Sequence, residues 1–434
     1  MIEYFTLKNF MSYRDETELS FVASKKDATK DSPDVSWYKE VDGKRLLRLI
    51  IGIGQNGTGK TKMIDALYYL RMIATRKPEK PSDLPAYRPF LLDKTSMNEP
   101  TEMRLSYYID GLNYIYYIKV SQLRIEEEEL RLFGGRSQRV FHRLYNPETD
   151  TVVINYGQAC DLSHSDEHTL KVNTVNNTTV LCQFGTMNLD SRILKINYDY
   201  FENHISKVPR NDQNLADKLS TGDVSRDQSM KRMLLQLFKD VGSNIIDYHV
   251  DASSLSIDEI IKSGAPQFVV NALRQQYPSG QIDNKVLRFE HSTTHGPSSL
   301  DSSMESLGTL NIVKLLIVLY DIVIGKKCTC IDELGSGIHS TALEFILRMY
   351  LMLNGDSQIF VATHDLSILQ SKYLRRDALR LFSKDADGVT SVCRQEYVHN
   401  SINLYKKYTN EISEQVNRVM EDESSFDEYK KSVE

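Results

Sequence analysis

Eight residues near the start of the chain have the types and the spacing needed to hold phosphate groups. The run Gly54-Gln55-Asn56-Gly57-Thr58-Gly59-Lys60-Thr61 follows the pattern G-x-x-x-x-G-K-[ST]. In such a loop the glycines let backbone N–H groups turn toward phosphates, and the dipole of the next helix adds positive charge. Lys60 would bridge the terminal phosphates, and the Thr61 hydroxyl would ligate Mg²⁺. The run predicts a nucleotide-binding loop, and a chance glycine-rich turn is the alternative.

Acidic residues of the right kind follow much later in the chain. Asp332 and Glu333 end the apolar run Cys328-Thr329-Cys330-Ile331. Such a pair places Asp332 in the magnesium shell and Glu333 beside the attacking water of a hydrolysis reaction. The alternative is a surface acid pair at the end of a strand, and the upstream phosphate loop favours the catalytic interpretation.

Two more groups complete the candidate site. Ser306-Leu307-Gly308 precedes an apolar helix, where a serine, a glycine and a helix N-terminus could meet a phosphate. A plain Ser N-cap is the alternative. His364 follows the apolar run Gln358 to Thr363, and a structural histidine is the alternative there.

The elements around these groups indicate an α/β fold. Arg45 to Ile53 is a near-continuous apolar run, typical of a strand buried on both faces, and Lys60 to Thr75 has helical periodicity. After residue 300 the pattern alternates between helix and strand: Leu310 to Ile324, Cys328 to Ile331, Thr341 to Leu353, and Gln358 to Thr363. Alternating helices and strands predict a parallel sheet.

Other regions are predicted as a β-rich part and a helical part. The predicted strands are Ile2 to Lys8, Glu16 to Val22, a Met103 to Val120 hairpin turning at Asp110-Gly111, Glu129 to Leu132 and Val140 to Tyr145. Between Gln158 and His295 the signals are weaker, with helices at Met230 to Val241 and Ile257 to Ser263 and no sustained heptads. We predict an N-terminal ATPase lobe with a β-rich subdomain (1–155), a mainly helical insertion (156–300), a C-terminal ATPase lobe (301–400) and a tail (401–434).

Composition excludes several classes of protein. The 434 residues include 53 Lys plus Arg and 59 Asp plus Glu, a net charge of −6, which excludes a wholly basic nucleic-acid binder. The most apolar stretch, Leu310 to Ile324, contains Lys314 and Asp321 and is shorter than a typical membrane span, so no membrane association is expected. The first residues show no secretion signal, which predicts a cytoplasmic location. Five cysteines without a CxxC pair argue against a disulfide framework, and Cys328 and Cys330 are expected to serve packing only.

The order of these motifs resembles the ABC-type ATPases of the SMC, RecF and OLD kind. A phosphate loop is followed by Ser-x-Gly, by an acidic pair whose Glu333 lies 27 positions after Ser306, and by a strand ending in Thr-His. More closely, LKNFMSYRDETELSFVASK, GQNGTGKTKMIDALYYLR, ESLGT, DELGSGIHS, VATHDLSIL and LRRDALRLFSKDADG look like bacterial AAA family ATPases of the abortive-infection AbiL and RloB-associated type. The resemblance implies a P-loop fold of the ABC or SMC-head type and a role in phage defence.

The resemblance also implies roles for single residues. Lys60 and Thr61 would bind the phosphates of ATP and Mg²⁺, Asp332 would act as the Walker B acid, Glu333 as the general base, and His364 as a sensor of the γ-phosphate. Ser306 and Gly308 would act in trans, in a homodimer that closes on the nucleotide. Such a dimer would control a separate effector, a nuclease or toxin, in response to a phage trigger; higher oligomers and nucleic-acid binding stay open.

Three further matches and two departures accompany the resemblance. Asn9, Phe10 and His339 match positions of the family, and packing is the expected role of Phe10. Leu307 stands where ABC transporters carry a second glycine, and no glutamine lid residue can be placed.

Three other functions compete with this interpretation. An OLD-type nuclease in this chain would need a TOPRIM unit, but Asp385-Ala386-Asp387-Gly388 is better explained as a hairpin turn, and only 70 residues follow His364. A RecF-like or SMC-like DNA clamp would need a basic groove, and its candidates are scattered: Arg45, Arg48, Arg71, Arg76, Lys77, Arg375 and Arg376. A small-molecule kinase or a GTPase is least favoured, since no [NT]KxD motif follows the loop.

Overall fold

The computed structural model describes residues 1–24, 36–80, 83, 85–208, 215–220, 228–334, 337–353, 355–371, 374–394 and 405–406. The chain divides into two compact units. Unit 1 comprises Met1–Val208, Ile322–Gly335 and Glu344–Glu434, and unit 2 comprises Pro209–Asp321 and Ser336–Leu343. Two helices cross the division: α10 (Leu307–Ile324) and α11 (Ser340–Met352). The boundaries of these two units differ from those of the predicted ATPase lobes (1–155 and 301–400), which stay predictions.

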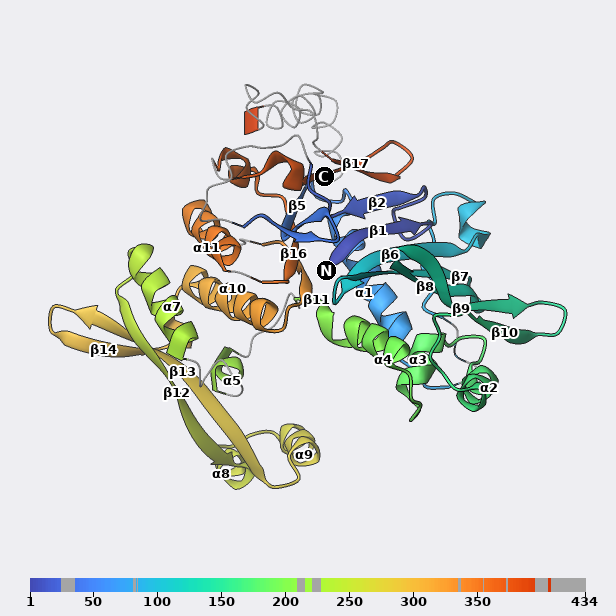
Figure 1. The fold of residues 1–434 in the computed structure, drawn as a ribbon. Helices are drawn as coiled ribbons and strands as arrows, with labels where there is room; N and C mark the ends of the chain where they lie inside the picture. Colours follow the sequence, from blue (N-terminus) through green and yellow to red (C-terminus); the bar gives the residue numbers. More distant parts are fainter. Residues whose placement is uncertain are drawn as a thin grey trace, which may run out of the picture. The chain divides into compact units, whose positions relative to one another are not determined.

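A six-stranded sheet forms the core of unit 1 (Figure 1). Its strands lie in the order β11 (Ile205–Lys207), β15 (Cys328–Asp332), β16 (Gln358–Thr363), β5 (Leu49–Ile53), β17 (Leu379–Lys384) and β18 (Thr390–Arg394). Every neighbouring pair is parallel except β17 and β18. The carboxyl ends of β5, β15, β16 and β17 therefore lie at one edge of the sheet. Ligands of open parallel sheets bind at this kind of edge.

Continuous burial explains why these segments form central strands. All residues of β5 and β16 are buried, as expected for strands covered on both faces. Helix α1 (Lys60–Thr75) begins directly after the loop that follows β5, and it buries Met63, Leu67 and Leu70 on one side. Its bounds agree with the predicted helix.

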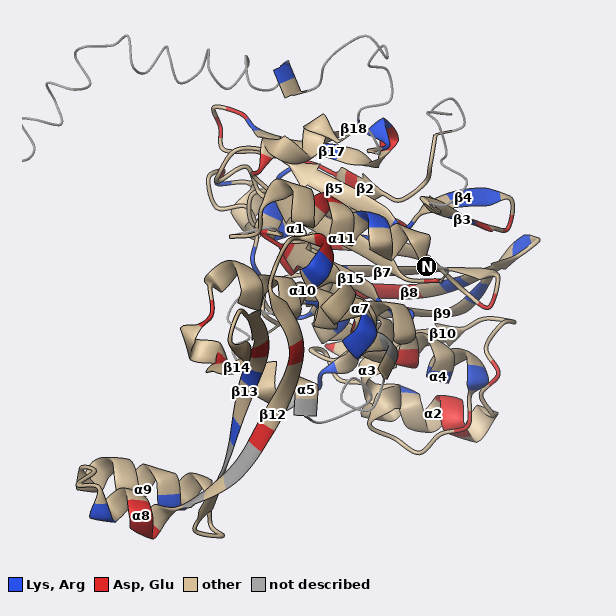
Figure 2. Ribbon diagram, turned by 90° about the vertical axis from the view of Figure 1, so that its left-hand side faces the viewer, with Lys and Arg blue, Asp and Glu red and all other residues tan. Residues whose placement is uncertain are grey.

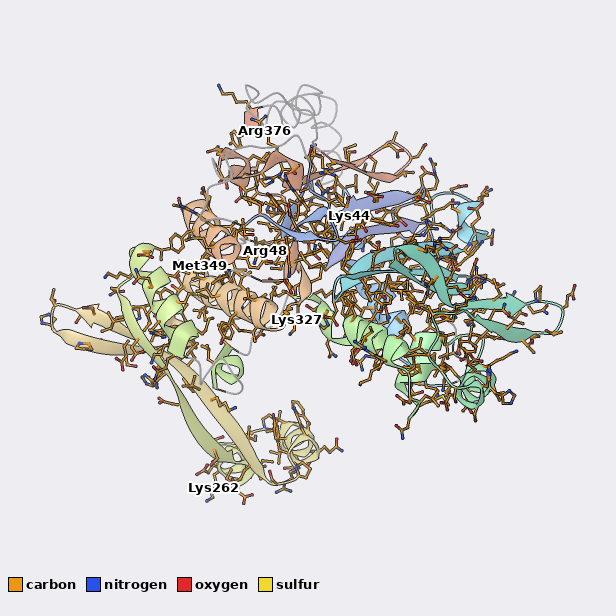
Figure 3. All side chains as sticks on the ribbon, viewed as in Figure 1. Lys44, Arg48, Lys262, Lys327, Met349 and Arg376 are labelled. Carbon is orange, nitrogen blue, oxygen red and sulfur yellow. The ribbon has the colours of Figure 1, made fainter. Side chains whose placement is uncertain are left out.

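The segment predicted as one strand, Arg45 to Ile53, is divided by Arg48 into two. β4 (Lys44–Leu47) pairs with β3 (Tyr38–Val41), and β5 enters the core sheet. Arg48 is 1% exposed and donates to the carbonyl oxygens of Ser36 and Leu351 at 3.2 and 3.3 Å (Figure 3). The terminal nitrogens of this buried arginine donate to backbone carbonyls. An arginine within an apolar run does not by itself indicate a break between two strands.

A second sheet of unit 1 is antiparallel and contains the predicted β-rich region. Its order is β10 (Thr151–Tyr156), β9 (Arg136–Asn146), β8 (Ile125–Gly134), β7 (Leu112–Val120), β6 (Thr101–Ile109), β1 (Ile2–Lys8) and β2 (Thr17–Ser20). Asp110 and Gly111 turn between β6 and β7 with φ values of 49° and 80°, as a type I′ hairpin requires. The predicted hairpin is confirmed, whereas β10 was not predicted.

Three helices of unit 1 lie beside this sheet (Figure 1). They are α2 (His164–Asn173), α3 (Val180–Gly185) and α4 (Arg192–Asp199), and a π-helical turn, η2 (Tyr200–His204), follows α4. The fully buried Glu128 of β8 accepts hydrogen bonds from the Val180 amide (2.7 Å) and the Tyr116 hydroxyl (2.9 Å). Thr179 caps α3 and donates to the Ile73 carbonyl at the end of α1 (3.0 Å). This network ties the antiparallel sheet to the helix of the phosphate loop.

Unit 2 contains helices and an exposed three-stranded sheet. The helices are α5 (Leu215–Ser220), α7 (Gln228–Asp240), α8 (Ile257–Lys262) and α9 (Gln267–Gln276). The sheet has the order β12 (Ile245–Ser256), β13 (Gln281–Thr293) and β14 (Gly296–Asp301). Within this unit, α8 and α9 lie at the end of the β12–β13 hairpin (Figure 1).

The predicted helices at 230–241 and 257–263 are present as α7 and α8, but the long hairpin in the same region was not predicted. Few residues of its strands are buried, among them Tyr248, Leu287 and Phe289. A strand with little burial shows no clear alternation of polar and apolar residues. Most of the predicted tail (401–434) lies outside the described residues.

Among the described helices, α10 is the one long and apolar enough to span a membrane. It has 18 residues, a mean hydropathy of 2.0, and 39% of them are buried. Core helices of water-soluble proteins pass the same test, so the finding is weak evidence for a span.

Candidate nucleotide-binding site

The loop between β5 and α1 has the backbone expected of a phosphate cradle. Gly57 and Gly59 adopt left-handed φ values of 83° and 99°. A Cβ atom on Gly59 would lie 2.5 Å from Thr390 Oγ1, and one on Gly54 would lie 2.4 Å from the Phe382 carbonyl oxygen. Gly54 and Gly59 therefore allow close approach to the β17–β18 hairpin, and Gly57 and Gly59 supply the required turn.

Lys60 lies at the centre of this loop. Its side-chain ammonium donates to the carbonyl oxygens of Gly54 (2.6 Å) and Gln55 (2.8 Å). Burial lowers the pKa of Lys60, while the carboxylates of Asp332 and Glu333 act in the opposite direction. The positive charge is held where phosphates of a bound nucleotide would need it.

The rest of the loop forms its outer rim. Thr58 is buried, and its hydroxyl donates to the Gln55 carbonyl at 2.8 Å. Gln55, Asn56 and Gly57 are exposed. The loop is thus fixed from inside, and its outer backbone faces solvent.

Thr61 and Asp332 come together as the sequence predicted. The Thr61 hydroxyl donates to Asp332 Oδ1 at 3.2 Å, although 271 residues separate them. A hydroxyl and a carboxylate oxygen are hard ligands of the kind Mg²⁺ prefers. In the described part of the chain, no group of three or more His, Cys, Asp or Glu forms a metal cage. Mg²⁺ here would need phosphate and water ligands, as it commonly does in nucleotide sites.

Glu333 and His364 lie at the same edge of the sheet as the loop. Asp332 pairs in register with Ala362, so Glu333 and His364 follow adjacent parallel strands. Both side chains are exposed, and Glu333 has a left-handed φ of 57°. The Leu334 amide donates to the Ala362 carbonyl (3.3 Å), which fixes the chain after Glu333. A strained backbone at a non-glycine residue is frequent at functional sites.

The Ser306 and Gly308 segment belongs to unit 2, whereas the other candidate residues belong to unit 1. Ser306 Oγ accepts from the Thr309 amide at 3.0 Å, so Ser306 caps α10. A Cβ on Gly308 would lie 3.0 Å from the Gly337 carbonyl oxygen, which favours glycine there for local packing. Ser306 is exposed. The N-cap that was the alternative interpretation of Ser306 is therefore present. A role of Ser306 in phosphate binding is a proposal.

Several contacts of the loop were not predicted from the sequence. The buried Tyr13 hydroxyl donates to the Gly59 carbonyl at 2.9 Å. The Thr390 amide donates to the Ser12 carbonyl at 2.7 Å. The connection after β1 and the β17–β18 hairpin therefore both support the glycine turn. Ser12 and Tyr13 lie in the N-terminal segment that carries the family resemblance, but no pattern in the sequence indicated their contacts or those of Thr390.

Asn9, Phe10 and His339, which match positions of the resembling family, each make contacts within the chain. Asn9 is buried, and its side-chain amide donates to the carbonyls of Ser96 (2.8 Å) and Glu99 (2.6 Å). Phe10 is 1% exposed and packs against Tyr69, which confirms its expected packing role. His339 Nδ1 accepts from the Thr341 amide (3.3 Å) at the start of α11.

The structure also bears on the competing interpretations. Asp385 to Gly388 forms the turn between β17 and β18, with Gly388 at φ 79°, as expected for a hairpin. Cys328 and Cys330 are buried in β15, and burial raises the pKa of the Cys328 thiol to about 12, in agreement with a packing role.

Most candidates for a basic groove are engaged within the chain. Arg71 donates to the Phe201 carbonyl and pairs with Glu202, which also pairs with Arg76. Arg375 is 3% exposed and pairs with Asp377. In Figure 2, Lys and Arg are interspersed with Asp and Glu on the ribbon.

Comparisons with known proteins relate the chain to a family model and to a solved structure. Residues 190–370 match the family model described as "AAA domain, putative AbiEii toxin, Type IV TA system". This match includes Ser306, Asp332, Glu333 and His364, and the phosphate loop lies before it. Among solved structures, the chain is similar to the SMC head domain from Thermotoga maritima, at 13% identity and a TM-score of 0.42, over 91% of this chain and 99% of that one. No curated protein matches the sequence.

The fold class can now be stated. The phosphate loop lies between β5 and α1, one strand separates β5 from the strand that ends at Asp332, and the segment with the remaining motifs matches an AAA family model. The described part of the chain has a mixed α/β fold with a phosphate-loop sequence between β5 and α1, and residues 190–370 resemble an AAA domain.

Proposed function

We propose that this chain binds ATP with Mg²⁺ and hydrolyses it to ADP and phosphate. The observation that carries the proposal is the contact of Thr61 with Asp332 beside the buried Lys60. Together they unite a helix N-terminus, an ammonium group, a hydroxyl and a carboxylate at one edge of a parallel sheet. This combination suits a nucleoside triphosphate with its metal ion better than an uncharged ligand.

Each residue has a role in the proposed reaction. Lys60 and the loop amides bind the β- and γ-phosphates, and Thr61 and Asp332 hold the metal ion. Mg²⁺ neutralises charge that develops on the phosphates during transfer. Glu333 accepts a proton from the attacking water, and His364 detects the γ-phosphate from the neighbouring strand. The preference for adenine over guanine rests on the AAA family match.

The proposed active form is a dimer closed by ATP. Ser306 and Gly308 lie at the N-terminus of α10, where Ser306 is exposed. They belong to unit 2, whereas the phosphate loop belongs to unit 1. In the proposed dimer, they contact the γ-phosphate of the ATP that is bound to the loop of the second copy. A solvent-exposed helix N-terminus can bind such an anion. Hydrolysis by Glu333 would then separate the two copies.

The proposed biological role is control of a separate toxic effector in defence against phages. The family that matches residues 190–370 is described with a toxin–antitoxin system, and the motifs of this chain resemble abortive-infection ATPases of the AbiL and RloB-associated type. A nucleotide can control another protein only if its bound and free states offer different surfaces. ATP-driven dimerisation provides such a difference. A DNA clamp of the RecF or SMC type is the alternative, and the intrachain contacts of Arg48, Arg71 and Arg375 weigh against it.

The molecular mass of the purified protein, measured with and without ATP, tests the dimer. Glu333→Gln keeps the loop but removes the base, so it should dimerise with ATP and release phosphate about 100 to 1000 times more slowly than wild type. Lys60→Ala should stay monomeric with ATP. A Glu333→Gln protein that neither dimerises nor loses hydrolysis would contradict the assignments of Glu333 and Ser306.

Phage plating on cells that carry the gene with its neighbouring genes tests the biological role. We expect wild type to reduce plating and Lys60→Ala to abolish the reduction at equal protein level. If Lys60→Ala protects as well as wild type, ATP binding by this chain does not control defence.

A further inference from the structure

Two pairs of large apolar side chains are exposed beside the proposed nucleotide elements. Leu91 and Leu92 of unit 1 are 64% and 72% exposed. Met304 and Leu307 of unit 2 are 74% and 76% exposed. Exposed apolar side chains that gather beside a functional element commonly mark an interaction surface.

The leucine pair is held near the phosphate loop by the connection after β1. The Phe90 amide donates to Asn9 Oδ1 (2.9 Å), and the Met11 amide donates to the Arg88 carbonyl (2.8 Å). Tyr13 of the same connection donates to the Gly59 carbonyl of the loop. The exposed pair is therefore fixed in place by the elements that support the loop.

Leu92 also lies at the edge of the core sheet where the phosphate loop lies. A Cβ on Gly388 would be 2.5 Å from Leu92 Cδ1, so Leu92 contacts the turn between β17 and β18. β17 is parallel to β5, and this turn follows its carboxyl end. The leucine pair and the phosphate loop therefore share one edge of the sheet.

The second apolar pair flanks Ser306 in the chain. Met304 ends the 3-10 turn η3 (Ser302–Met304), and Leu307 is the first residue of α10. The Thr309 amide holds Ser306, and His291 Nε2 lies 2.7 Å from Glu305 Oε1. These contacts fix the backbone while the two apolar side chains remain in solvent.

We propose that Leu91 and Leu92 of one copy bury Met304 and Leu307 of a second copy when ATP closes the dimer. This inference rests on the proposed function, because closure in trans brings the Ser306 segment of one copy to the loop of the other. Each closed site would then have an apolar seam beside its phosphates, which removes water from the reacting groups.

The charges that flank the two pairs support a second copy as the partner. Arg88 and Lys94 on either side of the leucines are exposed. Asp301 lies three residues before Met304, whereas the Glu305 side chain is buried against His291 and is not available to a partner. Asp93, between Leu92 and Lys94, offsets one of the two basic charges. The remaining basic charge beside the leucines and the acidic Asp301 beside Met304 favour contact between the two apolar pairs.

Dimerisation of Glu333→Gln chains with ATP tests this seam by sedimentation. Adding Leu92→Asp or Met304→Asp should raise the dimer dissociation constant about tenfold or more, because each leaves a charge against apolar groups. Leu112→Asp, at the β6–β7 turn, and Phe268→Asp, on α9, are matched controls, since both residues are exposed (41% and 75%) away from the seam. ATP affinity of the monomer, measured at low protein concentration, should be unchanged in all four, which separates the effect from misfolding.

Cysteine cross-linking supplies the second measurement. In a Cys393→Ser background, Leu92→Cys chains mixed with Met304→Cys chains should form a mixed disulfide with ATP and not without it. Dimerisation of Glu333→Gln that is equally tight with Leu92→Asp, Met304→Asp and the controls would overturn the seam and leave the proposed function intact. Absence of any ATP-dependent dimer of Glu333→Gln would instead overturn the proposed function itself.

Discussion

The phosphate loop and the Ser306 segment are proposed to bind the same phosphates, but they differ in how completely they are built. The loop is supported on every side within unit 1: Lys60 binds loop carbonyls, Tyr13 binds the Gly59 carbonyl, and Thr61 binds Asp332. The Ser306 segment is held by the capping contacts of Ser306 with Thr309 and by the contact of Glu305 with His291, and it is flanked by exposed Met304 and Leu307. Under the proposed function, a single copy would bind nucleotide through the loop, and the Ser306 segment would act only on the nucleotide of a second copy.

The largest expected effect comes from removing the charge inside the loop. Lys60→Ala should lower ATP affinity at least about 100-fold, because charge-assisted hydrogen bonds to phosphate are lost. Lys62→Ala, two residues along the same helix, serves as the control and should bind ATP nearly as wild type does. Calorimetric titration measures both. Equal affinity of the two variants would show that Lys60 does not face the phosphates.

A smaller effect is expected from the backbone of the loop. Gly59→Ala should weaken ATP binding about tenfold, because a side chain there meets Thr390 and disfavours the left-handed φ of 99°. Gly43→Ala provides the comparison, since Gly43 also has a positive φ (71°) but its Cβ would meet no atom within 4 Å. Both variants should lose a similar amount of stability in thermal unfolding, because alanine is strained at a positive φ. Any further loss of ATP affinity in Gly59→Ala, measured by ATP titration and compared with Gly43→Ala, then reports the contact with Thr390. The account of the loop would be wrong if Gly59→Ala bound ATP like Gly43→Ala.

Ser306→Ala separates capping from action in trans. Loss of the N-cap should cost about 1 kcal/mol of stability. Ser163→Ala removes a similar cap, that of α2, and should cost about as much. We expect only Ser306→Ala to abolish ATP-dependent dimerisation and hydrolysis, while ATP binding by the monomer persists. Equal phosphate release by the two variants would leave Ser306 as a cap and nothing more.

The smallest effect concerns the network that ties the antiparallel sheet to α1. Burial raises the pKa of Glu128 from its usual 4.5 to about 7, and the positive charge of Arg143 opposes the shift. Between those values the folded chain holds a proton that the unfolded chain has lost, so stability should fall as the pH rises through this window and then level off. Glu128→Gln should flatten this dependence, which urea unfolding at pH 5 and pH 7.5 would reveal. A steeper dependence in the variant would contradict the assigned protonation.

The sequence predicted the parts of the site that depend on local pattern. The loop, α1, β15, β16 and the β17–β18 turn follow from periodicity and glycine spacing, and these elements have nearly the predicted bounds. Tyr13, Ser12 and Thr390 could not be predicted, because their contacts with Gly59 depend on tertiary packing of distant segments. The β12–β13 hairpin was missed because its strands bury few residues. The break at Arg48 was missed because the contacts of its side chain with backbone carbonyls depend on tertiary packing. Exposure of Met304 and Leu307 likewise became visible only in the structure.

Phosphate release by mixed chains tests most directly whether two copies share one site. Lys60→Ala chains keep an intact Ser306 segment, and Ser306→Ala chains keep an intact loop, so each protein alone should be nearly inactive. A mixture of equal amounts should recover hydrolysis, to at most about half of the wild-type rate, because each mixed dimer holds one complete site of two. A mixture no more active than the sum of its separate components, or a Ser306→Ala protein that is fully active alone, would contradict a nucleotide site shared between two copies.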